Sequence, residues 1–124
     1  MRLLLRLTLI ASTLSVACSE RVILEAESPD RTRTATLLSR NSDSGVCIEA
    51  VVRIVDKAKS AAYESPIGAC YDMGSDIPRA YKSLEWRGDT LVVRADEEKE
   101  NLPDSFDVGP VHVLTERIAE GVTN

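Results

Sequence analysis

The segment Tyr81–Asp96, YKSLEWRGDTLVVRAD, decides the fold class of this 124-residue chain. Apolar side chains alternate along it on both sides of Gly88: Leu84 and Trp86 before the glycine, and Leu91, Val93 and Ala95 after it. A period of two predicts strands with one buried face, and a glycine between two such runs predicts a tight reversal. The segment is therefore predicted to be an antiparallel hairpin, with Arg87-Gly88-Asp89 as its turn.

Further strand patterns lie on either side of this hairpin: Arg21–Glu27, Thr32–Arg40, Val46–Lys57 and Val108–Arg117. Ser65–Asp72 is either a short strand or an extended connector. The turn signal Asn41–Gly45 makes its two flanking segments a second predicted hairpin. Helical spacing of apolar residues from Ile48 to Ala62 is a competing pattern. Dense β-branching favours a strand through about Val55, with a helical turn allowed after it.

Six or seven short strands with turn signals and no long helix imply a mainly β domain. We expect an antiparallel meander, folded as a curled sheet or a small open barrel and preceded by a signal-peptide helix. The predicted boundaries are a signal peptide over residues 1–17, a tether over 18–20, a single β domain over 21–118 and a tail over 119–124. Residues 97–107 are expected to be a solvated link inside the domain.

The first 18 residues, MRLLLRLTLIASTLSVAC, show the layout of a secretory signal. Arg2 and Arg6 supply a positive start, and Leu7–Val16 is an apolar run that ends in small side chains. A membrane-spanning helix needs roughly 20 apolar residues, and the charged pair Glu20-Arg21 follows too soon for one. The segment therefore predicts export rather than a transmembrane anchor.

The end of this segment, Leu14-Ser15-Val16-Ala17-Cys18, resembles a bacterial lipobox, although Ser15 stands where leucine is usual. The resemblance implies a diacylglycerol on Cys18, and each buried CH₂ of such an anchor contributes about 0.8 kcal/mol. Ser19 after the cysteine implies sorting to the outer membrane, facing the periplasm. The alternative is an ordinary signal-peptidase site after Ala17, which leaves Cys18 as an unmodified first residue.

Three cysteines, Cys18, Cys47 and Cys70, are an odd number for an exported protein. Lipidation of Cys18 leaves a pair. A bridge between Cys47 and Cys70 closes a loop of about 24 residues and would stabilise the fold by about 3.5 kcal/mol in the chain-entropy model. A redox-active pair or a metal site would call for a CxxC spacing, a histidine or a third thiol beside them. The sequence therefore predicts a structural disulfide between Cys47 and Cys70.

The charge of the chain argues against nucleic acid as a partner. Without residues 1–17 it has 13 basic residues against 20 acidic ones, a net charge of −7. Nucleic-acid affinity depends on clustered lysine and arginine, whereas the densest charge run here is Asp96–Glu100, which is mostly acidic. A nucleic-acid partner is therefore not predicted. The lipid that the lipobox resemblance implies at Cys18 makes the membrane the expected contact.

Two motifs carry a resemblance to known proteins. The first is Glu27-Ser28-Pro29-Asp30 before the strand Thr34–Leu38, and the second is Leu84-Glu85-Trp86 before Asp89–Val93. Together they resemble small bacterial lipoproteins that have an SPDGKY-type turn into a strand, a cysteine after the next turn and a late W-x-n-L-x-[IV] hairpin. Arg31 stands where that group has glycine. The resemblance implies a lipid-anchored β domain and supplies no activity.

Catalytic and metal-binding patterns are missing from the sequence. His112 is the one histidine and lies between two valines on a predicted strand, so we interpret it as an ordinary strand residue. No nucleophile turn of the GxSxG kind occurs. Asn41–Gly45 resembles the start of a calcium loop, but the twelfth position is Val52 instead of glutamate. We therefore predict neither an enzyme nor a cofactor.

Two functional hypotheses remain. The first is an envelope lipoprotein whose β domain is a non-catalytic binding or structural module, with an envelope protein as candidate partner. The alternative is a periplasmic inhibitor or immunity lipoprotein against a hydrolase or toxin. In that case the acidic segments Asp72–Asp76 and Asp96–Glu100 would enter the cleft of a basic target.

Overall fold

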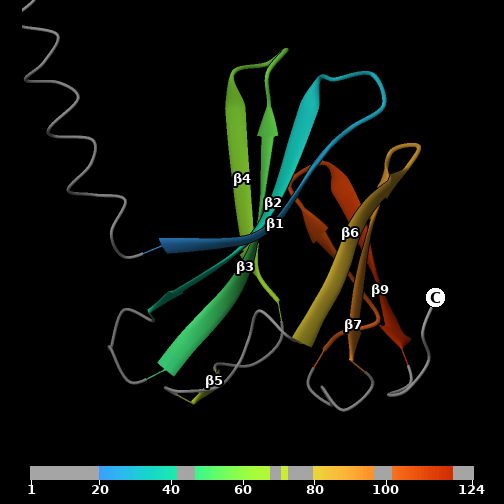
Figure 1. The fold of residues 1–124 in the computed structure, drawn as a ribbon. Helices are drawn as coiled ribbons and strands as arrows, with labels where there is room; N and C mark the ends of the chain where they lie inside the picture. Colours follow the sequence, from blue (N-terminus) through green and yellow to red (C-terminus); the bar gives the residue numbers. More distant parts are fainter. Residues whose placement is uncertain (1–19, 42–46, 68–70, 73–79, 97–101, 119–124) are drawn as a thin grey trace, which may run out of the picture.

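The computed structural model describes residues 20–41, 47–67, 71–72, 80–96 and 102–118. Within these ranges the chain forms nine β-strands in two sheets (Figure 1). The described ranges contain no helix that is both long enough and apolar enough to span a membrane. The prediction of a mainly β domain of short strands is confirmed.

The first sheet has the order β1-β2-β3-β4, and β5 lies beside β3. Its strands are β1 (Glu20–Glu27), β2 (Arg33–Asn41), β3 (Cys47–Asp56), β4 (Ala61–Pro66) and β5 (Tyr71–Asp72). β1 pairs antiparallel with β2, β2 with β3 and β3 with β4, so the predicted meander is present here. The predicted hairpin around Asn41–Gly45 is β2–β3, although residues 42–46 at its tip lie outside the described ranges.

The second sheet has the order β6-β7-β9-β8. Its strands are β6 (Tyr81–Arg87), β7 (Thr90–Asp96), β8 (Ser105–Val108) and β9 (Val111–Ile118). β6 and β7 form the predicted hairpin, in which Arg87 pairs with Thr90. The intervening Gly88 has a φ of +61°, which glycine adopts without strain.

The pairing of β7 with β9 is parallel, which differs from the expected wholly antiparallel meander. After β7 the chain forms β8 at the outer edge of the sheet and then returns as β9 between β7 and β8. The predicted last strand, Val108–Arg117, is therefore two strands joined at Gly109-Pro110. The end of the predicted solvated link belongs to β8, and Leu102 within that link is buried.

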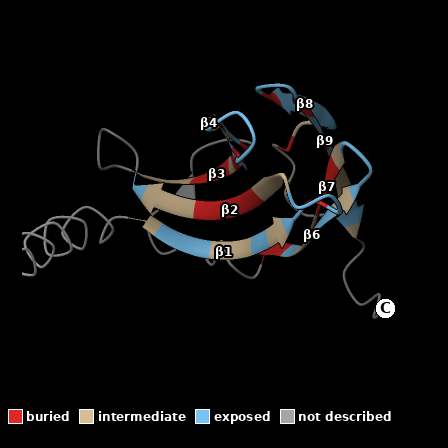
Figure 2. Ribbon diagram, turned by 90° about the horizontal axis from the view of Figure 1, so that it is seen from above, coloured by how far each residue is buried: buried red, intermediate tan, exposed pale blue. Residues whose placement is uncertain are grey.

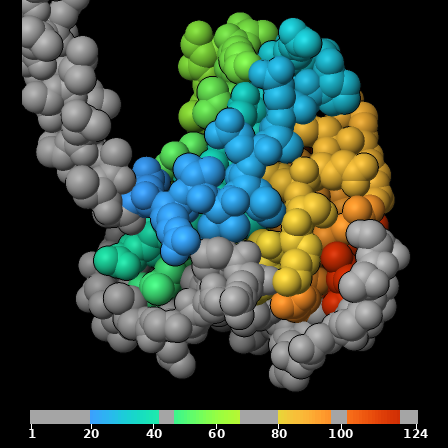
Figure 3. Space-filling model, in the orientation of Figure 1, coloured from blue at the N-terminus to red at the C-terminus, as the bar shows by residue number. Residues whose placement is uncertain are grey.

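The two sheets share one hydrophobic core. Its members include Leu37, Val52 and Ile54 from the first sheet and Leu91 and Val93 from the second, all fully buried. Figure 2 shows this burial on the central strands, while β1 is mostly exposed or half-buried. β1 nevertheless contacts β6 (Figure 3), so the sheets also meet along these two strands.

The outer faces of both sheets carry ion-pair networks over buried aliphatic residues. Leu38 and Val51 face away from the main core and are fully buried. The same face carries Arg53, whose guanidinium pairs with Glu64 and Glu20. Because arginine stems can cover apolar surface while the charge stays in water, this arrangement permits burial on both faces of the sheet. On the second sheet, Val92 is fully buried, and Arg87 and Arg94 pair with Glu116.

The ends of two strands can be compared with the sequence expectations. Residues 57–60, where a helical turn was allowed, form a turn between β3 and β4, and Ser60 within it has a φ of +51°. β3 forms a strand despite the helical spacing of its apolar residues because it pairs with β2 on one side and with β4 on the other. At the start of the domain, Glu20 belongs to β1 instead of the predicted tether.

Candidate functional site

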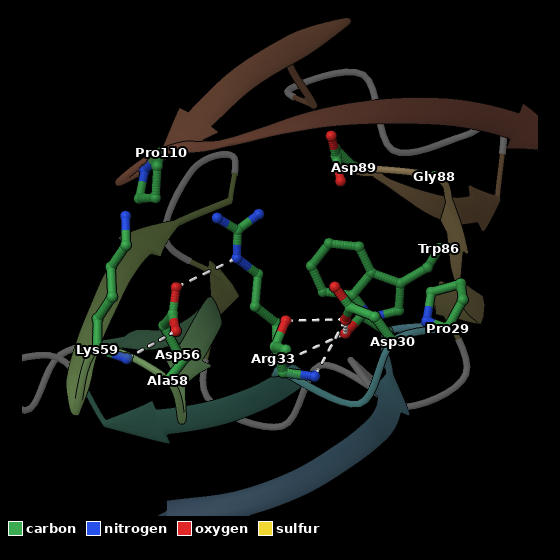
Figure 4. A pocket seen from close by; sticks show the side chains of 12 residues that line it. Pro29, Asp30, Arg33, Asp56, Ala58, Lys59, Trp86, Gly88, Asp89 and Pro110 are labelled. Carbon is green, nitrogen blue, oxygen red and sulfur yellow. Dashed lines mark hydrogen bonds and ion pairs between the residues drawn. The ribbon is translucent and has the colours of Figure 1, made fainter.

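Four hairpin turns, two from each sheet, meet around one pocket. They are the turns β1–β2, β3–β4, β6–β7 and β8–β9, and Figure 1 shows the first three near the upper end of the sheets. The pocket has a volume of about 540 Å³ and is lined by Ser28, Pro29, Asp30, Thr32, Arg33, Asp56, Ala58, Lys59, Trp86, Gly88, Asp89 and Pro110. We call it the turn-end pocket (Figure 4). Its volume lies within the usual range for sites that hold a small ligand.

The β1–β2 turn is held by hydrogen bonds within the Ser-Pro-Asp motif. One carboxylate oxygen of Asp30, Oδ1, accepts from the Ser28 hydroxyl at 2.7 Å, the Thr32 hydroxyl at 2.8 Å and the Thr32 amide at 3.0 Å. Ser28 Oγ in turn accepts from the amide of Arg33 at 3.0 Å. Arg31 has a φ of +62°, a conformation that favours glycine.

These hydrogen bonds lower the pKa of Asp30 to about 2, with the Thr32 amide as the largest cause and the Ser28 and Thr32 hydroxyls next. A carboxylate with a lowered pKa stabilises the fold above its ordinary value and loses that contribution as the pH falls. In this protein the loss runs from pH 3.8 down to about 2.

The Asp30→Asn variant is therefore expected to be less stable than the wild type above pH 4, with a difference that shrinks as the pH approaches 2. Urea unfolding at a series of pH values from 7 to 2 measures this. Glu25→Gln is the matched control, because Glu25 is exposed and its side chain has no hydrogen bond or ion pair within the described ranges. A constant difference between Asp30→Asn and wild type over this pH range would contradict the assignment.

Arg33 and Asp56 form the centre of the pocket. Arg33 Nε lies 3.4 Å from Asp56 Oδ2, and the two side chains are 21% and 4% exposed. Burial raises the pKa of Asp56, but the hydrogen bond from the Lys59 amide and the Arg33 guanidinium outweigh it, so the pKa lies below its usual value. The pair forms because Arg33 and Asp56 are opposite each other on β2 and β3.

The terminal nitrogens of Arg33 make no hydrogen bond with any described residue. Figure 4 shows the guanidinium projecting into the cavity beside the ring of Trp86. The Nε atom is used by Asp56, so the two terminal nitrogens are left for a ligand. A guanidinium edge of this kind matches a carboxylate or phosphate in a bidentate geometry.

Trp86 connects the two sheets at the wall of the pocket. Its indole Nε1 donates to the backbone oxygen of Ala26 on β1 at 3.0 Å. This bond satisfies the one polar atom of the indole and holds the ring against the first sheet. Pro29 and Pro110 add further apolar surface to the lining.

Comparison with known proteins does not assign this site. No family model matches the chain, and no curated protein or solved structure is significantly similar to it. The site therefore has to be interpreted from its own chemistry.

The predicted site residues lie away from the turn-end pocket or outside the residues that the structure describes. Cys18 and Cys70 fall outside the described residues, while Cys47 is the first residue of β3. Cys47 pairs in the ladder with Asp72, two residues after Cys70, and it is not a free thiol. The structure thus describes one member of the predicted Cys47–Cys70 bridge, and the bridge stays a prediction.

The structure describes His112 and part of the two acidic segments. His112 Nδ1 lies 2.9 Å from Asp107 Oδ1, and the two side chains are 51% and 73% exposed. Of the two acidic segments predicted for an inhibitor, only Asp72 and Asp96 fall within the described ranges. No group of three potential metal ligands comes together among the described side chains.

The sequence did not reveal Arg33, Asp56 and Trp86 as members of one site. The Ser-Pro-Asp motif was visible as a turn, and the tryptophan was visible as part of a hairpin. Their meeting depends on contacts between the sheets, such as the bond from Trp86 to Ala26, which joins residues 60 positions apart.

Proposed function

We propose that this chain is a non-catalytic binding module of the bacterial cell envelope, anchored by lipid on Cys18 to the outer membrane and facing the periplasm. The observation that supports binding is the convergence of four turns from two sheets around one pocket. Turns that served only to reverse the chain would not have to meet. Here they present an arginine edge and an aromatic wall to the same cavity.

The hydroxyl groups of the pocket lining serve the turn that carries them. The hydroxyl of Ser28 donates to Asp30 and accepts from the Arg33 amide, so both its donor and an acceptor site are engaged. Thr32 likewise donates its hydroxyl to Asp30. These contacts give both hydroxyls a structural role, which supports binding over nucleophilic chemistry as the function of the pocket.

The position of β1 suits an anchored binding module. One residue, Ser19, separates Cys18 from the start of β1 at Glu20. β1 has eight residues, which at about 3.3 Å per residue carry the chain about 25 Å before the Ser28 turn. The pocket thus lies at the end of β1 remote from the proposed anchor, where a ligand or partner has access while the chain is held at a bilayer.

The intact mass of the protein extracted from membranes without reductant tests the proposed anchor. We expect a chain that starts at Cys18, heavier by acyl groups and lighter by the two hydrogens lost in one disulfide. Cys18→Ser is the control, and it should leave the membrane fraction. An unmodified chain starting at Cys18, recovered in the soluble fraction, would contradict the proposal and leave the ordinary signal-peptidase site.

A further inference from the structure

We propose that the turn-end pocket binds a singly charged carboxylate carried on a flat apolar group. Arg33 is the anion-binding residue and Trp86 the stacking wall in this proposal. The inference rests on the proposed binding function and adds the chemical class of the ligand. It is independent of where in the envelope the chain is anchored.

The anion-binding part follows from how Arg33 is held. Asp56 engages Nε at 3.4 Å and is itself 4% exposed, so the base of the guanidinium has a partner inside the protein. Hydrogen bonds from an arginine to a carboxylate are strongest when two nitrogens bind two oxygens. The two terminal nitrogens project into the cavity and provide this pair (Figure 4). Lys59 supplies a second cation to the same lining.

The apolar part follows from the wall beside Arg33. The Trp86 ring borders the cavity next to the guanidinium, with Pro29 on the same side and Pro110 opposite (Figure 4). A flat apolar group attached to the carboxylate can therefore stack on the indole while its oxygens reach Arg33. Offset stacking between aromatic rings contributes about 0.5–1.5 kcal/mol beyond the area it buries.

The limit of one negative charge follows from the carboxylates in the lining. Asp30 is engaged by three donors within its own turn, and Asp56 by Arg33 and the Lys59 amide. Asp89 is exposed, lines the pocket and has no hydrogen bond or ion pair within the described ranges. Its uncompensated charge would repel a dianion such as a phosphate monoester more than a carboxylate.

Trp86 is the one tryptophan of the chain, so its fluorescence reports on this pocket alone. We expect phenylacetate to change that fluorescence saturably in the full mature protein. Phenylacetamide has the same shape without the charge and should bind about tenfold more weakly or worse, because it cannot accept a bidentate pair of charged hydrogen bonds. Phenyl phosphate tests the limit on charge and should also bind more weakly than phenylacetate.

Three variants separate binding from folding. Arg33→Gln should remove the preference for phenylacetate over phenylacetamide. Asp89→Asn should bind phenylacetate more tightly than wild type, and a gain of affinity does not arise from partial unfolding. Arg87→Gln is the matched control, because Arg87 adjoins the same turn but pairs with Glu116 on the outer face; its affinity should equal that of wild type.

Equal affinity for acid and amide, or a preference that survives Arg33→Gln, would overturn the proposed ligand class and leave a binding pocket of other chemistry. No saturable change with phenylacetate would overturn it as well. Neither result bears on the lipid at Cys18, which the intact mass tests separately. Tighter binding of phenyl phosphate would reassign the pocket to phosphate.

Discussion

Gly109→Ala is expected to lower the free energy of unfolding by about 2–5 kcal/mol. Gly109 has a φ of +56°, and a Cβ built on it would overlap the ring of Tyr63. The left-handed backbone costs an L-residue about 1–2 kcal/mol, and overpacking against a ring adds about 1–3 kcal/mol. Tyr63 is on β4 and Gly109 follows β8, so the substitution acts where the two sheets meet beside the turn-end pocket.

Gly88→Ala is the matched control for that variant. Gly88 has nearly the same φ, +61°, but a Cβ there would meet no atom within 4 Å. Gly88→Ala should therefore lower the free energy of unfolding only by the backbone contribution, about 1–2 kcal/mol. Guanidinium unfolding of the two variants measures the difference. In a Tyr63→Ala background, Gly109→Ala should lower the free energy of unfolding only as much as Gly88→Ala does. Equal losses of stability in the two single glycine variants would contradict the contact with Tyr63.

Local patterns were sufficient for the elements that pair with their chain neighbours. The β6–β7 hairpin could be predicted because Leu84 and Trp86 before the glycine turn, and Leu91, Val93 and Ala95 after it, recur with a period of two. The last three belong to the core. The alternation of β2 is weaker because Leu37 and Leu38 are both fully buried, on opposite faces of the sheet. A strand that is buried on both faces lacks the alternation of apolar and polar residues from which a buried face is predicted.

The parallel pairing of β7 with β9 could not be predicted in the same way. β8 lies between these two strands in the sequence and at the edge of the sheet, and the pairing depends on a register in which Leu91 lies beside Val113. No turn motif specifies such a pairing, because the two strands are joined through a third. Leu102 is also buried, although the residues around it include Glu100, Asn101 and Asp104.

The candidate site was the least predictable feature. Each of its turns has a local signature, such as the Ser-Pro-Asp motif or Gly109-Pro110. The ion pair of Arg33 with Asp56 and the bond from Trp86 to Ala26 depend on strand register and on the packing of the sheets. These are long-range properties. A single sequence therefore shows the turns but not their convergence.

Cys70→Ser is expected to lower the free energy of unfolding by about 3.5 kcal/mol, the chain-entropy value for a loop of about 24 residues. The register places Cys47 opposite Asp72, and Cys70 is two positions away along the chain. β5 has two residues and one neighbour, β3, so the bridge would hold a strand that has little other support. Urea unfolding of the oxidised protein and of the variant gives the difference.

Reduction of the wild-type protein supplies the control for this prediction, because it removes the bridge without changing a residue. Reduced wild type and oxidised Cys70→Ser should then unfold at the same urea concentration, and reductant should leave the variant unchanged. If Cys47 were bonded to Cys18 instead, Cys18→Ser would be the destabilised variant and Cys70→Ser would keep the stability of wild type. That outcome would also exclude lipid on the Cys18 thiol, since one sulfur cannot carry both a thioether and a disulfide, and it would remove the proposed anchor together with the predicted bridge.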